Sequence, residues 1–447
     1  MRASPAHPRS RRCRLSLPLR LVILALAVGI SSSATASPAR ASTFEIPGSI
    51  AGDCSVDVTR PILSWIASVP DNSTLNFSEG ACYRLDGTLD IANRHGLDFE
   101  GNGATFEPVS SGDPHRAEWR LDEGSDYIFR DMTVRGANPA GGTFNSAYQW
   151  QHGFDLRGTA NADLDHVAVS DVYGDCFYLG QATDGSRAWS SGIHIHDSTC
   201  RGSGRMGVAI TAGRSVLIER NTISQVGLTA VDIEPNGGSL GFGARGITIA
   251  SNEIDCRETF DAIGKGPVAA VTVRDNHVTG YGMHMAVRAP TGERRSNFTI
   301  KGNVSDTGYY APGSDVMDFV RIDGLVVTGN TAPVSGPNMA LAWVSTSSNV
   351  LISGNSFPGG VAEVRYQPTL SSVTPGGGTV GTRVTIKGAH FRGATAVTFH
   401  RVSAPFAVVS PTQIVARVPR GATTGAIRVR TPGGTATSTT RFRVPAR

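Results

Sequence analysis

Short stretches that alternate apolar and polar residues recur along residues 97–355, and most are followed by an Asn, Asp or His. In VLIERNTISQ, from residue 216, and VTVRDNHVTG, from residue 271, apolar side chains occupy alternate positions. This alternation predicts strands with one buried and one polar face. The shared polar positions lie 24 to 35 residues apart and are Asn102, Asp131, His166, Asp197, Asn221, Asn252, Asn276, Asn303, Asn330 and Asn355.

A repeat of this length, with short strands, predicts one coil of a parallel β-helix per repeat. No coil can bury its apolar face alone, so stacking of coils has to build the core. Ten anchors predict about ten coils, and an Asn at the same corner of consecutive coils predicts a ladder of side-chain amides. A β-sandwich of hairpins would instead give shorter spacings and many two-residue turns.

These repeats, together with the opening VPDNSTLNF at residues 69–77, resemble the right-handed β-helix proteins of the pectate-lyase-like superfamily. The resemblance covers roughly residues 44–365. It implies the fold but leaves the activity open, because that superfamily includes pectate lyases, polygalacturonases, other hydrolases, epimerases and phage depolymerases.

The composition changes after Tyr366. Residues 367–444 contain short alternating strands separated by Gly and Pro, which is typical of a β-sandwich, and they resemble an IPT/TIG immunoglobulin-like domain. The expected fold class is therefore all-β. A right-handed parallel β-helix of about ten coils over residues 42–365 is followed by an immunoglobulin-like β-sandwich over residues 366–447.

Residues 1–41 have the pattern of an export signal. Five arginines between Arg9 and Arg20 precede an apolar run at 21–30, and small residues follow. The run is too short to span a bilayer comfortably, so no transmembrane segment is expected after removal of the signal. We expect a secreted, extracellular protein and leave association with the cell wall open.

Five cysteines remain outside the signal: Cys54, Cys82, Cys176, Cys200 and Cys256. Export permits disulfides, and Cys54–Cys82 is the preferred pair. One of the other three must remain unpaired. Because no cysteine has CxxC spacing and no dense acidic cluster of the calcium-binding kind is present, neither a metal nor another cofactor is expected.

Charge is distributed unevenly along the chain. Residues 366–447 contain eleven Lys and Arg and no acid, whereas residues 42–365 contain 23 basic and 37 acidic residues, a net charge of −14. The basic C-terminal domain could hold an anionic cell-wall polymer or simply be solvated. A nucleic-acid partner is not expected, because the basic residues are dispersed and no recognition helix is visible.

A second strand is expected about ten residues after each anchor, and its outward side chains would line an elongated groove. The candidate segments are 174–180, 204–211, 228–235, 261–266 and 281–288. If their apolar residues point inward, the outward set is Tyr178, Asp232, Glu234, His284 and Arg288, with Asp175 and Arg205 at strand entrances.

The expected catalytic residues are Asp232, Glu234 and Asp175. Asp232 and Glu234 lie two positions apart on one strand, so they share a face at about 7 Å, which permits two-carboxylate hydrolysis. Proximity would also raise the pKa of one carboxyl so that it serves as the acid. Asp175 partly resembles the paired-Asp motif of polygalacturonases, but Cys176 stands in place of the second Asp and the later Arg-x-Lys is absent.

The expected substrate-binding residues are two arginines, two histidines and two aromatics. Arginine can clamp hydroxyl pairs or sugar acids, histidine can act as a base or a binding group, and aromatic rings can stack on sugars. They are Arg205, Arg288, His284, His152, Tyr178 and Trp150. The residues favour a glycoside hydrolase that cleaves a polysaccharide. A non-catalytic surface protein that binds polysaccharide, and a lyase or epimerase acting on uronates, stay open as alternatives.

Overall fold

The computed structural model describes residues 42–445, apart from 236–242, 309–314, 334–339 and 359–361. The expected export signal, residues 1–41, lies outside the described residues. Within these described ranges, no helix is long and apolar enough to cross a membrane.

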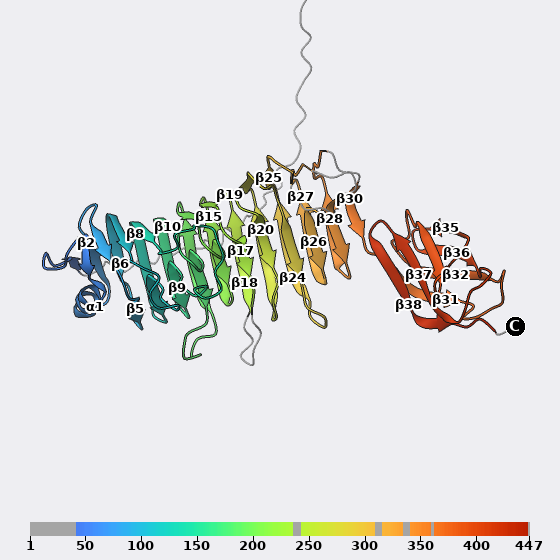
Figure 1. Ribbon diagram of the computed structural model, residues 1–447, viewed down its shortest axis with the longest axis horizontal. Helices are drawn as coiled ribbons and strands as arrows, with labels where there is room; N and C mark the ends of the chain where they lie inside the picture. The colour runs from blue at the N-terminus through green and yellow to red at the C-terminus, as the bar shows by residue number, and fades with distance from the viewer. Residues whose placement is uncertain (1–41, 236–242, 309–314, 334–339, 359–361, 446–447) are drawn as a thin grey trace, which may run out of the picture. The chain divides into compact units, whose positions relative to one another are not determined.

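The first part of the described chain is a parallel β-helix built from two long sheets (Figure 1). Sheet A has 19 strands: β1 (Ser42–Glu45), β2 (Asp53–Asp57), β3 (Ser73–Asn76), β4 (Cys82–Arg84), β6 (Asp98–Glu107), β8 (Ser125–Arg135), β10 (Ala160–Ser170), β12 (Ser190–His196), β13 (Thr199–Arg201), β15 (Gly213–Glu219), β16 (Thr222–Ser224), β18 (Ala244–Ala250), β19 (Glu253–Asp255), β21 (Val268–Arg274), β22 (His277–Val278), β24 (Arg295–Lys301), β25 (Val304–Ser305), β27 (Ile322–Thr328) and β29 (Ser348–Ser353).

Sheet B has one strand per coil. Its 11 strands are β5 (Leu89–Ala92), β7 (Trp119–Asp122), β9 (Phe154–Arg157), β11 (Phe177–Gly180), β14 (Val208–Ile210), β17 (Thr229–Ile233), β20 (Glu258–Ala262), β23 (Met285–Arg288), β26 (Met317–Val320), β28 (Ala340–Ser345) and β30 (Ala362–Tyr366). Each strand pairs in parallel with the equivalent strand of the next coil. The described residues therefore form about eleven coils, one more than the ten anchors predicted.

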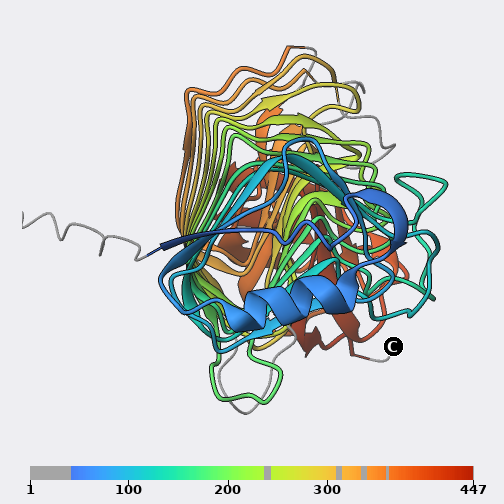
Figure 2. The same cartoon turned by 90° about the vertical axis from the view of Figure 1, so that its left-hand side faces the viewer.

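Apolar side chains of successive coils stack on one another inside the β-helix. On sheet B, the buried residues Val208, Val231, Phe260 and Met285 lie in one register. Because each rests on its equivalents in the neighbouring coils, stacking builds the core, as expected. Helix α1 (Thr59–Ser68) lies across the N-terminal end of the coils (Figure 2) and buries Ile62, Trp65 and Ile66 against the first of them.

The predicted ladder of amides runs along one corner from Asn221 to Asn355. At each step a side-chain Nδ2 donates to the Oδ1 of the next Asn at 2.8–3.0 Å. Most members are fully buried, and Nδ2 also donates to a backbone carbonyl of the preceding coil. The members are Asn221, Asn252, Asn276, Asn303, Asn330 and Asn355.

Four of the predicted anchors do not belong to this ladder. Asp131, His166 and Asp197 lie one residue before the ladder position, and they and Asn102 have left-handed φ values of 48–52°. Through the successive strand pairs, Asp131, His166 and Asp197 align with Gly302 of a later coil, which also has positive φ. Asn, Asp and His tolerate this conformation better than other non-glycine residues, so the same residue types mark two adjacent corner positions. That ambiguity shifted the anchors by one residue.

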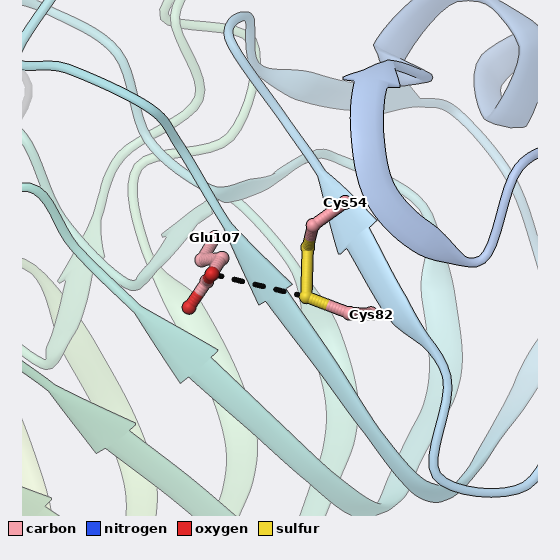
Figure 3. Close-up of side chains that lie close together, drawn as sticks. All are labelled: Cys54, Cys82 and Glu107. Atoms are coloured by element: carbon pink, nitrogen blue, oxygen red, sulfur yellow. Dashed lines mark hydrogen bonds between the residues drawn. A yellow bond between two sulfur atoms is a disulfide. The ribbon is translucent and has the colours of Figure 1, made fainter.

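Two disulfides reinforce the β-helix. The predicted Cys54–Cys82 bridge is confirmed; it joins β2 to β4, with the Glu107 carboxylate 3.8 Å from Cys82 Sγ (Figure 3). The other bridge is Cys176–Cys200, so the unpaired cysteine is Cys256, which is buried. Cys176 directly precedes β11, and its bridge therefore ties the entrance of a sheet B strand to sheet A.

The C-terminal residues form an antiparallel sandwich, as expected for an immunoglobulin-like domain. One four-stranded sheet contains β31 (Thr369–Thr374), β32 (Arg383–Ala389), β36 (Gln413–Arg417) and β35 (Phe406–Ser410). The other contains β34 (Val402–Ser403), β33 (Ala396–Phe399), β37 (Gly425–Thr431) and β38 (Gly434–Phe442). Apolar residues including Ile386, Phe399, Ile414 and Ile427 form a core of their own.

Candidate functional site

The outward side chains of sheet B form one row, because parallel register places equivalent residues side by side about 4.8 Å apart. Over the middle coils the row contains four carboxylates and one phenol. In strand order it reads Asp155, Tyr178, Ala209, Asp232, Asp261, Ala286 and Asp318. Asp232 and Asp261 are direct neighbours on β17 and β20.

Asp232 is the central carboxyl of this row. Its side chain is only 1% exposed, and neither carboxyl oxygen has a hydrogen-bond partner among the described residues. Burial raises the pKa of Asp232 to about 8; the charge of Glu234 adds to the shift, and Arg205 opposes it. The folded protein therefore holds a protonated carboxyl at neutral pH. Glu234 follows β17 directly and is half-buried.

Asp261 provides a second perturbed carboxyl. It is buried, and Thr229 Oγ1 donates to its Oδ2 at 3.1 Å. Burial and a hydrogen bond with Glu258 raise the pKa of Asp261 to about 7. One ligand atom each from Glu258, Asp261 and His284 lie within 4.8 Å of one another. His284 is also buried, which lowers its pKa.

Asp261 and Glu258 were not among the residues predicted from the sequence, because a strand was expected at residues 261–266. That placement was wrong: β20 spans Glu258–Ala262. Phe260 and Ala262 occupy the inward positions that Val231 and Ile233 occupy one coil earlier. Matching these apolar pairs in the sequence would have aligned Asp261 with Asp232 and identified Asp261 as an outward carboxyl.

Asp175 lies beneath the outward face and not on it. It is 0% exposed, its Oδ2 is 3.2 Å from His152 Nδ1, and its Oδ1 accepts the Met206 backbone N–H at 3.0 Å. Arg205 Nε lies 3.6 Å from the same Oδ1. The predicted catalytic role of Asp175 stays a prediction; its carboxylate is enclosed by these groups, and Oδ2 has no hydrogen-bond partner among the described residues. Asp175 holds His152 and Arg205.

The two predicted aromatic contacts differ in accessibility. Tyr178 is 8% exposed, since the His152 ring stacks on it at 4.8 Å and the Arg157 guanidinium lies 5.2 Å from its centroid. The predicted substrate-binding roles of Tyr178 and His152 stay predictions: both side chains are buried, and their rings face each other. Trp150 is 40% exposed, with the Arg205 guanidinium 5.6 Å from its ring. This indole remains available to a ligand.

The neighbouring acids of the row are neutralised by arginines. Asp155 is fully buried but accepts hydrogen bonds from Arg120 Nε at 3.0 Å and Arg157 Nε at 2.9 Å. Asp318 accepts one from the exposed Arg288. Asp232 has no such direct partner among the described residues. The middle coils therefore bring together Asp232, Glu234, Arg205 and Trp150. The cluster of Asp261, Glu258 and His284 lies beside them.

The parallel register of the coils places the chain among the parallel β-helix proteins, and the carboxyls with raised pKa lie on one of its sheets. The chain belongs to the family described as "Right handed beta helix region", whose model matches residues 122–357. Residues 368–444 match the IPT/TIG domain. Both expectations from the sequence are thereby confirmed. No curated protein matches the chain in sequence.

Solved structures share the fold at low sequence identity. The surface protein and adhesin PfbA of Streptococcus pneumoniae has a TM-score of 0.50 and 13% identity, covering 72% of this chain and 99% of that chain. A hyperthermoactive exopolygalacturonase from Thermotoga maritima has a TM-score of 0.50 and 10% identity, covering 71% of this chain and 92% of that chain. At such identities the likeness shows the fold alone.

Proposed function

We propose that this protein is a glycoside hydrolase that cleaves a polysaccharide on the outward face of sheet B, with Asp232 as the general acid. The observation that carries the proposal is a buried, unpartnered carboxyl whose pKa is about 8. A carboxyl that keeps its proton at neutral pH can deliver it to a glycosidic oxygen. The solved exopolygalacturonase indicates that this fold can accommodate such chemistry.

Glu234 is the proposed second carboxylate. It lies two residues after Asp232, is half-buried, and its negative charge helps to hold the proton on Asp232. In hydrolysis it would activate water or attack the anomeric carbon, depending on the distance between its carboxylate and that of Asp232. Arg205, Arg288 and Trp150 would bind the sugar chain. Asp175 and His152 are positioning residues beneath them.

The test is turnover on a panel of acidic and neutral polysaccharides, read as new reducing ends and as ultraviolet-absorbing unsaturated products. Asp232→Asn and Glu234→Gln should each reduce cleavage by at least about 100-fold, the usual minimum for losing an acid or base group. Asp90→Asn is the matched control. It changes a carboxylate on the same sheet, five strands from β17, and should leave turnover unchanged.

The other outcomes separate the alternatives. Full activity of both variants would contradict the assignment of Asp232 as the acid and Glu234 as the second carboxylate. Unsaturated products would favour a lyase, and retention on a polysaccharide with no new ends would favour a non-catalytic surface protein. The last two results each identify one alternative class.

We also propose that the protein is exported and that its C-terminal domain binds an anionic cell-wall polymer. All ten Lys and Arg described between residues 366 and 445 are exposed, and this segment contains no acid. Exposed like charges attract polyanions in a salt-dependent way. Retention on an anionic polymer should weaken with added salt and in the Arg428→Gln/Arg430→Gln variant. Unchanged retention of that variant would contradict the proposal.

A further inference from the structure

A histidine and carboxylate cluster lies on sheet A, away from the row on sheet B. Asp163 and Asp165 on β10 pair in register with His194 and His196 on the adjacent strand β12. The two histidines are two residues apart and therefore share a face, and their rings stack with centroids 4.0 Å apart. All four side chains are partly exposed, so the cluster is accessible to a small ion.

Both imidazoles direct one nitrogen toward the same carboxylate oxygen. Asp163 Oδ1 lies 3.2 Å from His194 Nδ1 and 3.0 Å from His196 Nε2. One ligand atom from each of the three residues falls within 4.8 Å of the others. A tetrahedral zinc ion with bonds of about 2.0–2.1 Å holds its ligand atoms about 3.4 Å apart. The observed separations are close to that geometry.

The other nitrogen of each histidine faces an outer carboxylate. His196 Nδ1 is 2.7 Å from Asp197 Oδ2, and His194 Nε2 is 3.4 Å from Glu219 Oε1. Metal-binding histidines almost always donate their second N–H to a carboxylate or carbonyl, which fixes the tautomer and ring orientation. His196 therefore has the outer hydrogen-bond partner typical of a metal-binding histidine, whereas His194 Nε2 has the Glu219 carboxylate at ion-pair distance without a hydrogen bond.

Arg220 holds these two outer carboxylates in place. Its Nη2 lies 2.8 Å from Asp197 Oδ2, and its Nη1 donates to Glu219. The guanidinium offsets the charge of the outer pair, while the central oxygen of Asp163 lies between the two imidazoles. The cluster is thus organised around Asp163.

Another histidine of sheet A, His277, lacks this organisation. His277 Nδ1 lies 2.7 Å from Glu253 and its Nε2 lies 2.9 Å from Asp306, so its two nitrogens point to different carboxylates. No second imidazole joins them in these contacts. His277 is therefore a paired surface histidine and a matched control.

We propose that Asp163, His194 and His196 bind a divalent transition-metal ion of the Zn²⁺ kind, with one carboxylate oxygen and two imidazole nitrogens as ligands. Imidazole with a carboxylate suits zinc better than calcium or magnesium, which prefer oxygen ligands. Three protein ligands leave a fourth position for water or another ligand. Because this site lies on sheet A, it does not depend on the proposed hydrolase function.

The test is calorimetric titration of the untagged, full-length, chelator-treated protein with Zn²⁺ at neutral pH. We expect one saturable site, lost in His196→Ala and weakened at least about tenfold in the near-isosteric Asp163→Asn. Asp197→Asn, which removes an outer partner, should weaken binding about 10- to 100-fold. His277→Ala should bind zinc like the wild type.

Three results would overturn the site. They are no saturable binding, wild-type affinity in both His196→Ala and Asp163→Asn, or equal loss in His277→Ala. Circular dichroism of each variant checks that the β-helix is intact. Wild-type zinc binding in Asp232→Asn would show that the metal site and the proposed active site are separate.

Discussion

Replacing Asp232 by Asn should stabilise the protein in a pH-dependent way while it removes the proposed hydrolase activity. Asn has nearly the same shape as Asp, but it cannot ionise and so never places a charge in this buried position. In the wild type, the folded-state pKa is about 8 whereas the ordinary value is 3.8. The folded chain therefore keeps a proton that the unfolded chain loses.

The difference between the folded-state and unfolded-state pKa of Asp232 sets the sign and size of the change in stability. The free energy of unfolding of the wild type falls as pH rises from about 4 to about 8, because only the unfolded state releases the proton of Asp232 over that range. A shift of about four units corresponds to about 5–6 kcal/mol. Relaxation and water penetration reduce such penalties, so we expect about 3 kcal/mol. The advantage of Asp232→Asn should be absent near pH 4 and full above pH 8.

The assay is urea unfolding of both proteins from acidic to alkaline pH, with turnover measured on the same samples. Asp155→Asn is the control, because it makes the same substitution in the same row at a carboxylate paired with Arg120 and Arg157. It should destabilise the protein by about 1–3 kcal/mol, since two arginines lose their partner. A pH-independent advantage for Asp232→Asn, or an equal gain from Asp155→Asn, would refute the reasoning.

Other predictions follow from the same contacts. Asn276→Ala should lower the free energy of unfolding by about 4 kcal/mol, because the Asn276 side chain makes four buried hydrogen bonds with Ile249, Asn252 and Asn303 at about 1 kcal/mol each. Asn145→Ala, in an exposed turn, is the control. It should change the free energy of unfolding by less than about 1 kcal/mol in the same urea titration. Cys176→Ala/Cys200→Ala should cost about 3 kcal/mol for opening a loop of 24 residues, and an unchanged urea midpoint would contradict this. If the proposed hydrolase is correct, turnover should decline above about pH 8 as Asp232 loses its proton, and a pH–rate profile that stays flat would exclude Asp232 as the acid. Arg205→Lys should raise KM about tenfold with a smaller change in kcat, because lysine keeps the charge but loses the planar contact with Trp150; steady-state kinetics on a cleaved polysaccharide would measure it.

The amino-acid sequence by itself determined the β-helix, the C-terminal sandwich and, for the middle strands other than β20, the side that faces the core. Alternation is a local property, so Val231 and Ile233 indicate an inward face wherever their coil lies. The Cys54–Cys82 bridge was predicted in the same way, from two cysteines near one end of the repeat. Asp232 was recognised because it stands between two apolar residues of a strand.

Only the tertiary structure decided how deeply the polar residues are buried and which of them meet. Asp261 lies beside Asp232, and Asp163 lies beside His194, because of register between coils joined by corners of variable length. Tyr178 alternates with inward residues along β11 and Asp175 precedes that strand, yet residues of a neighbouring coil cover both. The alternation along one strand specifies which side chains point inward. Burial and side-chain contacts depend on residues about 24 to 35 positions away, and the stacking of the coils brings those residues together.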